Sequence, residues 1–203
     1  MKEKSIKINA VLNVIKTISS IIFPLITFPY ISRVLMPDNV GKVNFGSSFV
    51  SYFSLIASLG ITTYAIRECS AKRKNKEKLS RTASQIFSIN VITTIIAYVS
   101  MAIILLLFRN LDSYRTLIII QSTAILFATL GCDWLNSAME DFAFITVRTI
   151  AFQIISLVLM FAFVRKPSDY ITYAAITVLS SSGANIINIF YRKNIVPSDL
   201  LDK

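Results

Sequence analysis

The sequence predicts an all-α integral membrane protein that folds as a bundle of six membrane-spanning helices. Hydrophobic residues make up 54% of the 203-residue chain and charged residues only 16%, whereas soluble domains carry about 25% charged residues. The apolar residues lie in long blocks separated by short charged clusters, as is typical of membrane proteins. Several of these blocks also carry polar side chains at helical spacing, which predicts helices with one distinct face.

Each expected span contains the roughly 20 mainly apolar residues that an α-helix needs to cross a bilayer. The first, 10–32, follows a basic N-terminus as a signal peptide would, but it shows no small-residue cleavage site, so we expect it to be retained. The second and third, 43–66 and 83–108, contain no charged residue. These three segments are therefore expected to be helices embedded in lipid.

The remaining three spans are expected over 116–136, 142–164 and 170–190. The first two of these are joined by the polar turn "NSAMED", and they contain Asp133 and Arg148. Together the six spans predict one lobe over 10–190. Segment 1–9 is then the N-terminus and segment 191–203 a polar tail.

The distribution of Lys and Arg predicts the orientation of the spans. Most of the 21 Lys and Arg residues lie on the side of the two termini and of the loop "RECSAKRKNKEKLSR". Because cytoplasmic loops are rich in Lys and Arg, we expect both termini in the cytoplasm. The basic loop has two interpretations, a binding surface for anionic lipid head groups or a topology determinant exposed to solvent.

Composition also argues against several classes of function. The net charge of +10 is placed at the ends of apolar blocks rather than on one soluble face, which argues against nucleic-acid binding. Histidine is absent and the two cysteines follow no metal spacing. We therefore expect no metal, no cofactor and no catalytic site, and the short outer loops leave no room for the catalytic loop of a membrane-embedded enzyme.

The expected second span carries a ladder of polar side chains on one helical face. Its members recur at intervals of three or four residues: Asn44, Ser47, Ser51, Ser54, Ser58 and Thr62. Similar stripes pass through Ser20 in the first span and Ser181 in the sixth, and others occur in the third and fourth. Such stripes either allow close packing with hydrogen bonds between helices or line a hydrated cavity. Because so many spans carry one, we favour a shared polar interior.

Ionisable residues within the expected spans are candidate site residues, because a charge in lipid is costly unless it has a partner or water. Lys16 lies at the edge of the first polar stripe, although it could equally snorkel to the interface. Asp133 lies on the polar face of the fourth span, where a solvated carboxylate at a helix end is the alternative. Pro24 and Pro29 each remove a backbone hydrogen bond, and we expect them to bend the first span, as a hinge or as a static kink.

Three stretches of the chain are distinctive in their order and spacing: "FPLITFPYISRVLMPDNVGKVNF", "SLIASLGITTYAIRECSAKR" and "LGCDWLNSAMEDFAFITVRTI". Together they resemble the bacterial polysaccharide flippases of the multidrug/oligosaccharidyl-lipid/polysaccharide exporter superfamily. The sequence departs from the family after "YISRVL", where Met36, Pro37, Asp38 and Asn39 replace the usual Gly-Pro-Glu-Gly. It also departs between Trp134 and Glu140, where the family has an aromatic residue followed by Gln-Gly.

The resemblance implies one lobe of a two-lobed exporter in the bacterial plasma (inner) membrane. Such a protein would move polyprenyl-diphosphate-linked oligosaccharide for O-antigen, lipopolysaccharide, capsule or teichoic-acid assembly. The chain is about half the family's usual length, so a truncated frame, a fragment, or a half-transporter that pairs with a second half or with assembly proteins are all open. From the charges and stripes we expect the substrate to contact Lys16, with Arg148 less favoured, and Asp133, Ser20, Ser51 and Ser181.

Two other functions remain open from the sequence. An ion-coupled multidrug efflux transporter would share the fold, but its pocket would be more apolar and aromatic, with few cations. A non-functional truncated remnant would keep the helices without any transport.

Overall fold

The computed structural model describes residues 6–188, and within this range every regular element is helical. The α-helices are α1 (Ile6–Ser58), α2 (Ile61–Ala71), α3 (Lys76–Leu107), α4 (Arg115–Gly131), α5 (Asp133–Ala138), α6 (Phe142–Phe163) and α7 (Tyr170–Ser182), and two 3₁₀ turns are η1 (Arg109–Tyr114) and η2 (Pro167–Asp169). The expected all-α class is confirmed. The expected tail over 191–203 and most of the N-terminal segment lie outside the described residues.

Four helical stretches in the described part of the chain are long and apolar enough to cross a membrane: Ala10–Ala71, Lys76–Leu107, Arg109–Gly131 and Phe142–Phe163. The protein is therefore a multi-pass membrane protein. The first stretch is 62 residues long, about three times the length that one pass through a bilayer requires, and the reason is that α1 folds back on itself.

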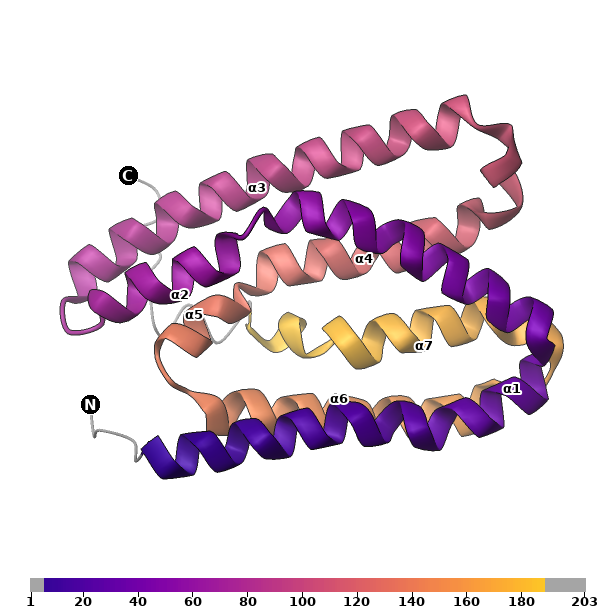
Figure 1. The fold of residues 1–203 in the computed structure, drawn as a ribbon, viewed down its shortest axis with the longest axis horizontal. Helices are drawn as coiled ribbons and strands as arrows, with labels where there is room; N and C mark the ends of the chain where they lie inside the picture. Colours follow the sequence, from indigo (N-terminus) through magenta and orange to yellow (C-terminus); the bar gives the residue numbers. More distant parts are fainter. Residues whose placement is uncertain (1–5, 189–203) are drawn as a thin grey trace.

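Helix α1 reverses direction at Met36, which has φ 65° and ψ 158°. The residue before a proline disfavours helical backbone, and Pro37 follows Met36 directly. The reversal divides α1 into a first limb (residues 6–35) and a second limb (residues 37–58). Figure 1 shows them as two separate helical rods joined at one end. We expected a loop between the first two spans, over residues 33–42. The structure instead has helix up to residue 35 and again from residue 37, with Met36 as the non-helical residue between them. The backbone stays helical at Pro24 and Pro29, which we expected to bend the first span, and the non-helical residue within α1 is Met36, next to Pro37.

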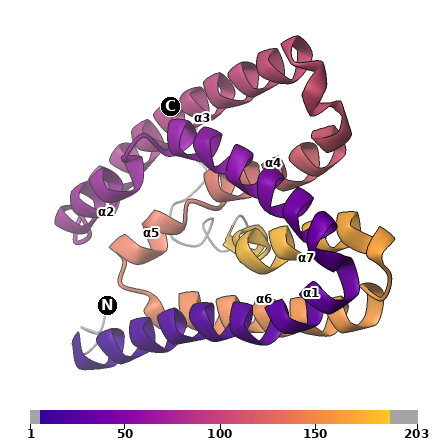
Figure 2. The same ribbon diagram turned by 45° about the vertical axis from the view of Figure 1, so that its right-hand side comes forward.

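The two limbs of α1 pack against different partners. The first limb lies beside α6 in both ribbon views (Figures 1 and 2), and the second limb packs on α3 and α4. At the Met36 end, Ile31, Leu35, Met160, Val164 and Ile176 form one apolar core. A second core joins the second limb to α3 and α4 through Val50, Phe53, Ala57, Ala97, Met101, Leu105, Ile118 and Ile125. Helix α7 packs against α4 and α6.

Three of the expected spans are interrupted at a similar depth. Leu59 and Gly60 separate α1 from α2 with φ of 36° and 72°, and Cys132 separates α4 from α5 with φ of 47°. Helix α7 ends before Gly183, and a further helical segment follows it.

Beyond the breaks, α2, α5 and the first turns of α3 form a compact end cluster. Its apolar core contains Ala65, Cys69, Leu79, Ala83, Ile86, Cys132, Trp134, Leu135 and Ala138. At its surface, the Arg73 guanidinium lies 2.9 Å from the Glu140 carboxylate, and the Ser70 hydroxyl donates to the Ala138 carbonyl at 3.3 Å. The end cluster is therefore a packed unit joined to the rest by the interrupted segments.

Candidate functional site

A pocket of about 390 Å³ opens between the second limb of α1, α4 and α7. Hydroxyl groups from two of these helices line it: Ser47, Ser51, Ser54, Thr177, Ser181 and Ser182. The rest of the lining is the buried amide of Gln121 and small or apolar side chains of α1, α4 and α7. Ser51 and Ser181, which sequence periodicity selected in two separate spans, are thus brought to one pocket.

Three serines of the polar ladder, Ser47, Ser51 and Ser54, face this pocket, and the adjacent side of the second limb is packed against other helices. Val50, Phe53 and Ala57 are buried against α3 and α4, whereas Ser47, Ser51 and Ser54 are exposed. The Ser51 hydroxyl donates to the Ser48 carbonyl at 2.7 Å. A hydroxyl bonded in this way is tolerated in apolar surroundings and still offers acceptor lone pairs to a ligand.

Close approach of the second limb to α4 positions Gln121 at one side of the pocket. A side chain at Gly46 would place its Cβ 2.4 Å from the Gln121 Oε1, so only glycine fits there with Gln121 in this rotamer. The Gln121 Nε2 donates to the Val43 carbonyl at 3.0 Å. Gln121 therefore fixes α4 to α1 beside the ladder.

Lys16 and Ser20 lie on the first limb and are not among the residues that line the pocket. Ser20 is exposed and donates to the Lys16 carbonyl at 2.9 Å. Lys16 is half-buried, and within residues 6–188 its ammonium group has no hydrogen-bond or ion-pair partner. Contacts of Thr146 with the Leu12 carbonyl and of Ser19 with Gln153 hold this limb against α6 on either side of Lys16.

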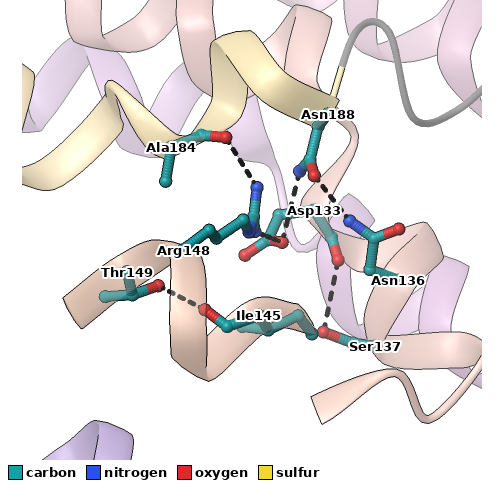
Figure 3. A network of polar contacts seen from close by, with 8 residues as sticks. All are labelled: Asp133, Asn136, Ser137, Ile145, Arg148, Thr149, Ala184 and Asn188. Atoms are coloured by element: carbon teal, nitrogen blue, oxygen red, sulfur yellow. Dashed lines mark hydrogen bonds and ion pairs between the residues drawn. The ribbon is translucent and has the colours of Figure 1, made fainter. Parts of the chain in front are cut away.

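Arg148 and Asp133 form an ion pair at the break between α4 and α5, shown in Figure 3. The Arg148 side chain is 4% exposed and the Asp133 side chain 38%. Arg148 also donates to the Ala184 carbonyl at 2.8 Å. Asn188 donates to Asp133 at 3.4 Å and accepts from Asn136 at 2.8 Å. The network joins α5, α6 and the segment that follows α7.

This network changes the interpretation of both charged residues. Asp133 is the first residue of α5, so it lies at a helix end, as one of the two alternatives stated. Its carboxylate is nevertheless paired with the Arg148 guanidinium and is not simply solvated. The sequence analysis missed this pairing. A signal was available, because Asp133 and Arg148 lie at similar distances along the chain from the turn at Glu140 and therefore reach the same depth in neighbouring antiparallel helices.

The polar stripes of α3 and α4 are used for packing between helices. Asn90 and Thr93 both donate to the Ala57 carbonyl, at 3.0 and 2.6 Å, and the Thr94 and Thr129 hydroxyls lie 2.8 Å apart. All four of these polar side chains are buried. These polar side chains of α3 and α4 therefore serve the close packing of helices, which was one of the two alternatives. The pocket-lining serines of the ladder on α1 are instead exposed.

The whole described part of the chain matches a known protein family. Residues 6–196 match the model of the family described as "Polysaccharide biosynthesis protein". A protein of Escherichia coli (strain K12) described as "Putative O-antigen transporter" is 23% identical over 169 residues, which cover 83% of this chain and 40% of that relative. The chain thus spans less than half the length of this curated relative. No solved structure matches it.

Proposed function

Because the chain belongs to the polysaccharide biosynthesis protein family, we propose that it forms the N-terminal lobe of a lipid-linked oligosaccharide flippase. The lobe comprises residues 10–190, and the complete transporter moves polyprenyl-diphosphate-linked repeat units across the bacterial plasma membrane for surface polysaccharide assembly. The two limbs of α1, α3, α4 with α5, α6 and α7 supply its six passes. The matched residues cover only 40% of the Escherichia coli relative. In the proposed transporter, a second lobe therefore faces the lobe described here, either on a separate chain or on a longer chain that contains both lobes.

The observation that carries the proposal is the open hydroxyl ladder. Oligosaccharides need many hydrogen-bonding groups along their path, and a row of serines offers them without a charge that would bind too tightly. Ser47, Ser51 and Ser54 occupy an exposed face of the second limb, while Asn90, Thr93, Thr94 and Thr129 of α3 and α4 are buried in contacts between helices. The three exposed serines of the ladder, together with Thr177, Ser181 and Ser182 of α7, are therefore the pocket hydroxyls available to a sugar.

Lys16 is the cation that we assign to the diphosphate. Its half-buried ammonium has no partner among the described residues, and an unpaired cation near an anionic group forms strong, charge-assisted hydrogen bonds. Arg148 is engaged with Asp133 in this conformation. Its contact with substrate requires that pair to open, and Asp133 would then be the group released for ion coupling.

Alternating access requires parts of the lobe to move relative to others. The breaks at Gly60 and Cys132, together with the end of α7 at Gly183, lie between the end cluster and the pocket, and breaks in membrane helices are common where transporters bend. Pro24 and Pro29 supply further bending in the first limb, beside Ser20. With both termini in the cytoplasm, the end cluster covers the cytoplasmic side of the pocket.

Cysteine accessibility along the second limb tests the polar path. In cells, Ser47→Cys, Ser51→Cys and Ser54→Cys should react with a membrane-impermeant or small polar thiol reagent in at least one transport state. Tyr52→Cys is the matched control, because Tyr52 is exposed at the same depth on the apolar side of the helix and should stay protected by lipid. The two native cysteines are buried, so background labelling is low. Ladder positions as unreactive as Tyr52→Cys in every state would overturn the proposal.

Substitution of Lys16 tests the diphosphate contact in the complete transporter. Hydrogen bonds to charged groups contribute about 1.5–3 kcal/mol, so Lys16→Ala should lower flipping at limiting substrate by roughly ten-fold or more at equal expression, and Lys16→Arg should retain most of it. Flipping unchanged by Lys16→Ala would assign Lys16 to the interface, as the snorkelling alternative requires.

A further inference from the structure

We propose that the exposed face at the start of α3 is a binding surface for anionic phospholipid head groups of the inner leaflet. The surface, which we name the basic stripe, consists of Lys78 and Arg81 with Lys74 in the preceding turn. The proposal rests on the orientation given under Proposed function, which places this end of α3 in the cytoplasm.

The structure separates the free cations of the basic loop from those with a structural role. The Lys72 ammonium contacts the Glu68 carboxylate at 3.3 Å and the Thr82 hydroxyl at 3.1 Å, and Arg73 pairs with Glu140. Lys74, Lys78 and Arg81 are exposed, and within residues 6–188 none of the three has an ion-pair partner. Their charges are therefore available to an external anion.

The basic stripe is continuous with the apolar face that α3 turns toward lipid. Lys78 and Arg81 share one side of the helix with Gln85 and then with a run of half-exposed apolar side chains: Ile89, Ile92, Ile96, Val99 and Ile103. The opposite side, which includes Leu79, Ala83 and Ile86, is buried in the end cluster. The stripe thus faces the membrane surface around the lobe rather than the protein interior.

The depth of the stripe suits phospholipid head groups. Arg81 lies eight residues before Ile89, about 12 Å along the axis, and the head-group region on each side of the hydrocarbon core is about 5–8 Å thick. Lys and Arg side chains extend several ångströms toward the interface, so Arg81 reaches the phosphates. Lys78, about 4.5 Å further along, lies within a Debye length of about 8 Å.

One acidic residue lies close to the stripe. Glu77 is exposed in the first turn of α3, but with Lys74, Lys76, Lys78 and Arg81 around it the local charge stays positive. Each Lys or Arg near an anionic surface strengthens binding by about five-fold. We therefore expect the stripe to enrich anionic lipid beside α3.

A photo-reactive amino acid at Gln85, between the stripe and the lipid-facing residues, tests this proposal. The full chain is reconstituted in nanodiscs of phosphatidylcholine with a minority of phosphatidylglycerol, and the ratio of the two lipids in the cross-linked adducts is measured by mass spectrometry. We expect phosphatidylglycerol to be enriched several-fold over the bulk ratio. In the variant Lys78→Gln/Arg81→Gln the enrichment should fall by up to about five-fold for each cation removed.

The matched control is Arg109→Gln/Arg165→Gln, which removes the same charge at the opposite end of the bundle and should leave the adduct ratio unchanged. An equal loss in this control, or no loss in the stripe variant, would overturn the proposal.

If the stripe variant fails to fold, the salt dependence of the enrichment in the unsubstituted protein tests the proposal. Enrichment of phosphatidylglycerol that persists at about 1 M salt is not electrostatic and would overturn the proposal. The assay measures no transport, so a negative result leaves the proposed transport activity untouched.

Discussion

Replacing Asp133 with Asn removes the negative charge that balances Arg148 while it keeps the size of the side chain. The Arg148 side chain is 4% exposed and Asp133 38%, so the guanidinium loses its counter-ion in a site from which water is largely excluded. Loss of one partner of a fully buried ion pair costs about 3–5 kcal/mol. Because water reaches one side of Asp133, we expect Asp133→Asn to lower the free energy of unfolding by about 1–3 kcal/mol.

The reverse substitution should cost less. Arg148→Met leaves the Asp133 carboxylate partly solvated and still within 3.4 Å of the Asn188 amide, so we expect a loss near 1 kcal/mol. In the double variant neither charge is left unpaired. The two losses should therefore not add, and we expect a coupling free energy of about 1 kcal/mol or more.

The two native cysteines provide the assay for this pair. Cys69 is 0% exposed and Cys132 2% exposed, so a thiol-reactive dye reports their release during unfolding in mixed detergent micelles. Asp112→Asn is the control, because the Asp112–Arg115 pair is 45–56% exposed at 3.5 Å and such surface pairs contribute at most about 1 kcal/mol. If Asp133→Asn costs no more than Asp112→Asn, or if the double variant is strictly additive, the network does not stabilise the fold as argued.

Two further predictions concern helix packing and use the same dye assay. Gly131→Ala would place a Cβ 2.5 Å from the Cβ of Asn185 and 3.1 Å from its Cα, so the helical segment that follows α7 would have to move, at about 1–3 kcal/mol. Gly41→Ala, with nothing within 4 Å, should leave stability unchanged or slightly higher, and equal effects would contradict the close approach. Asn90→Ala removes a 3.0 Å interhelical hydrogen bond and should cost about 0.6–1.5 kcal/mol. Ser88→Ala, whose hydroxyl bonds only its own helix, should cost less, and an equal cost would refute the interhelical role.

The local sequence was sufficient for the all-α class and for the shared face of the serines of the second limb. Runs without charge and periodic serines are properties of neighbouring residues, so the common side of Ser47, Ser51 and Ser54 followed from spacing alone. The same spacing did not distinguish a stripe that lines a pocket from one that packs. Asn90 and Thr94 carry the same kind of pattern, yet both are buried in contacts between helices.

Only the tertiary structure decided where the chain reverses, which charges pair and which stripes stay open. Pro24, Pro29 and Pro37 are alike in sequence, but the backbone leaves helical geometry only beside Pro37, at Met36. The pairing of Arg148 with Asp133 depends on two helices meeting at one depth. Composition and periodicity fix the class of each segment, because burial in lipid demands apolar, internally hydrogen-bonded helices. The partner of each polar face depends on how distant segments pack, which no single segment encodes.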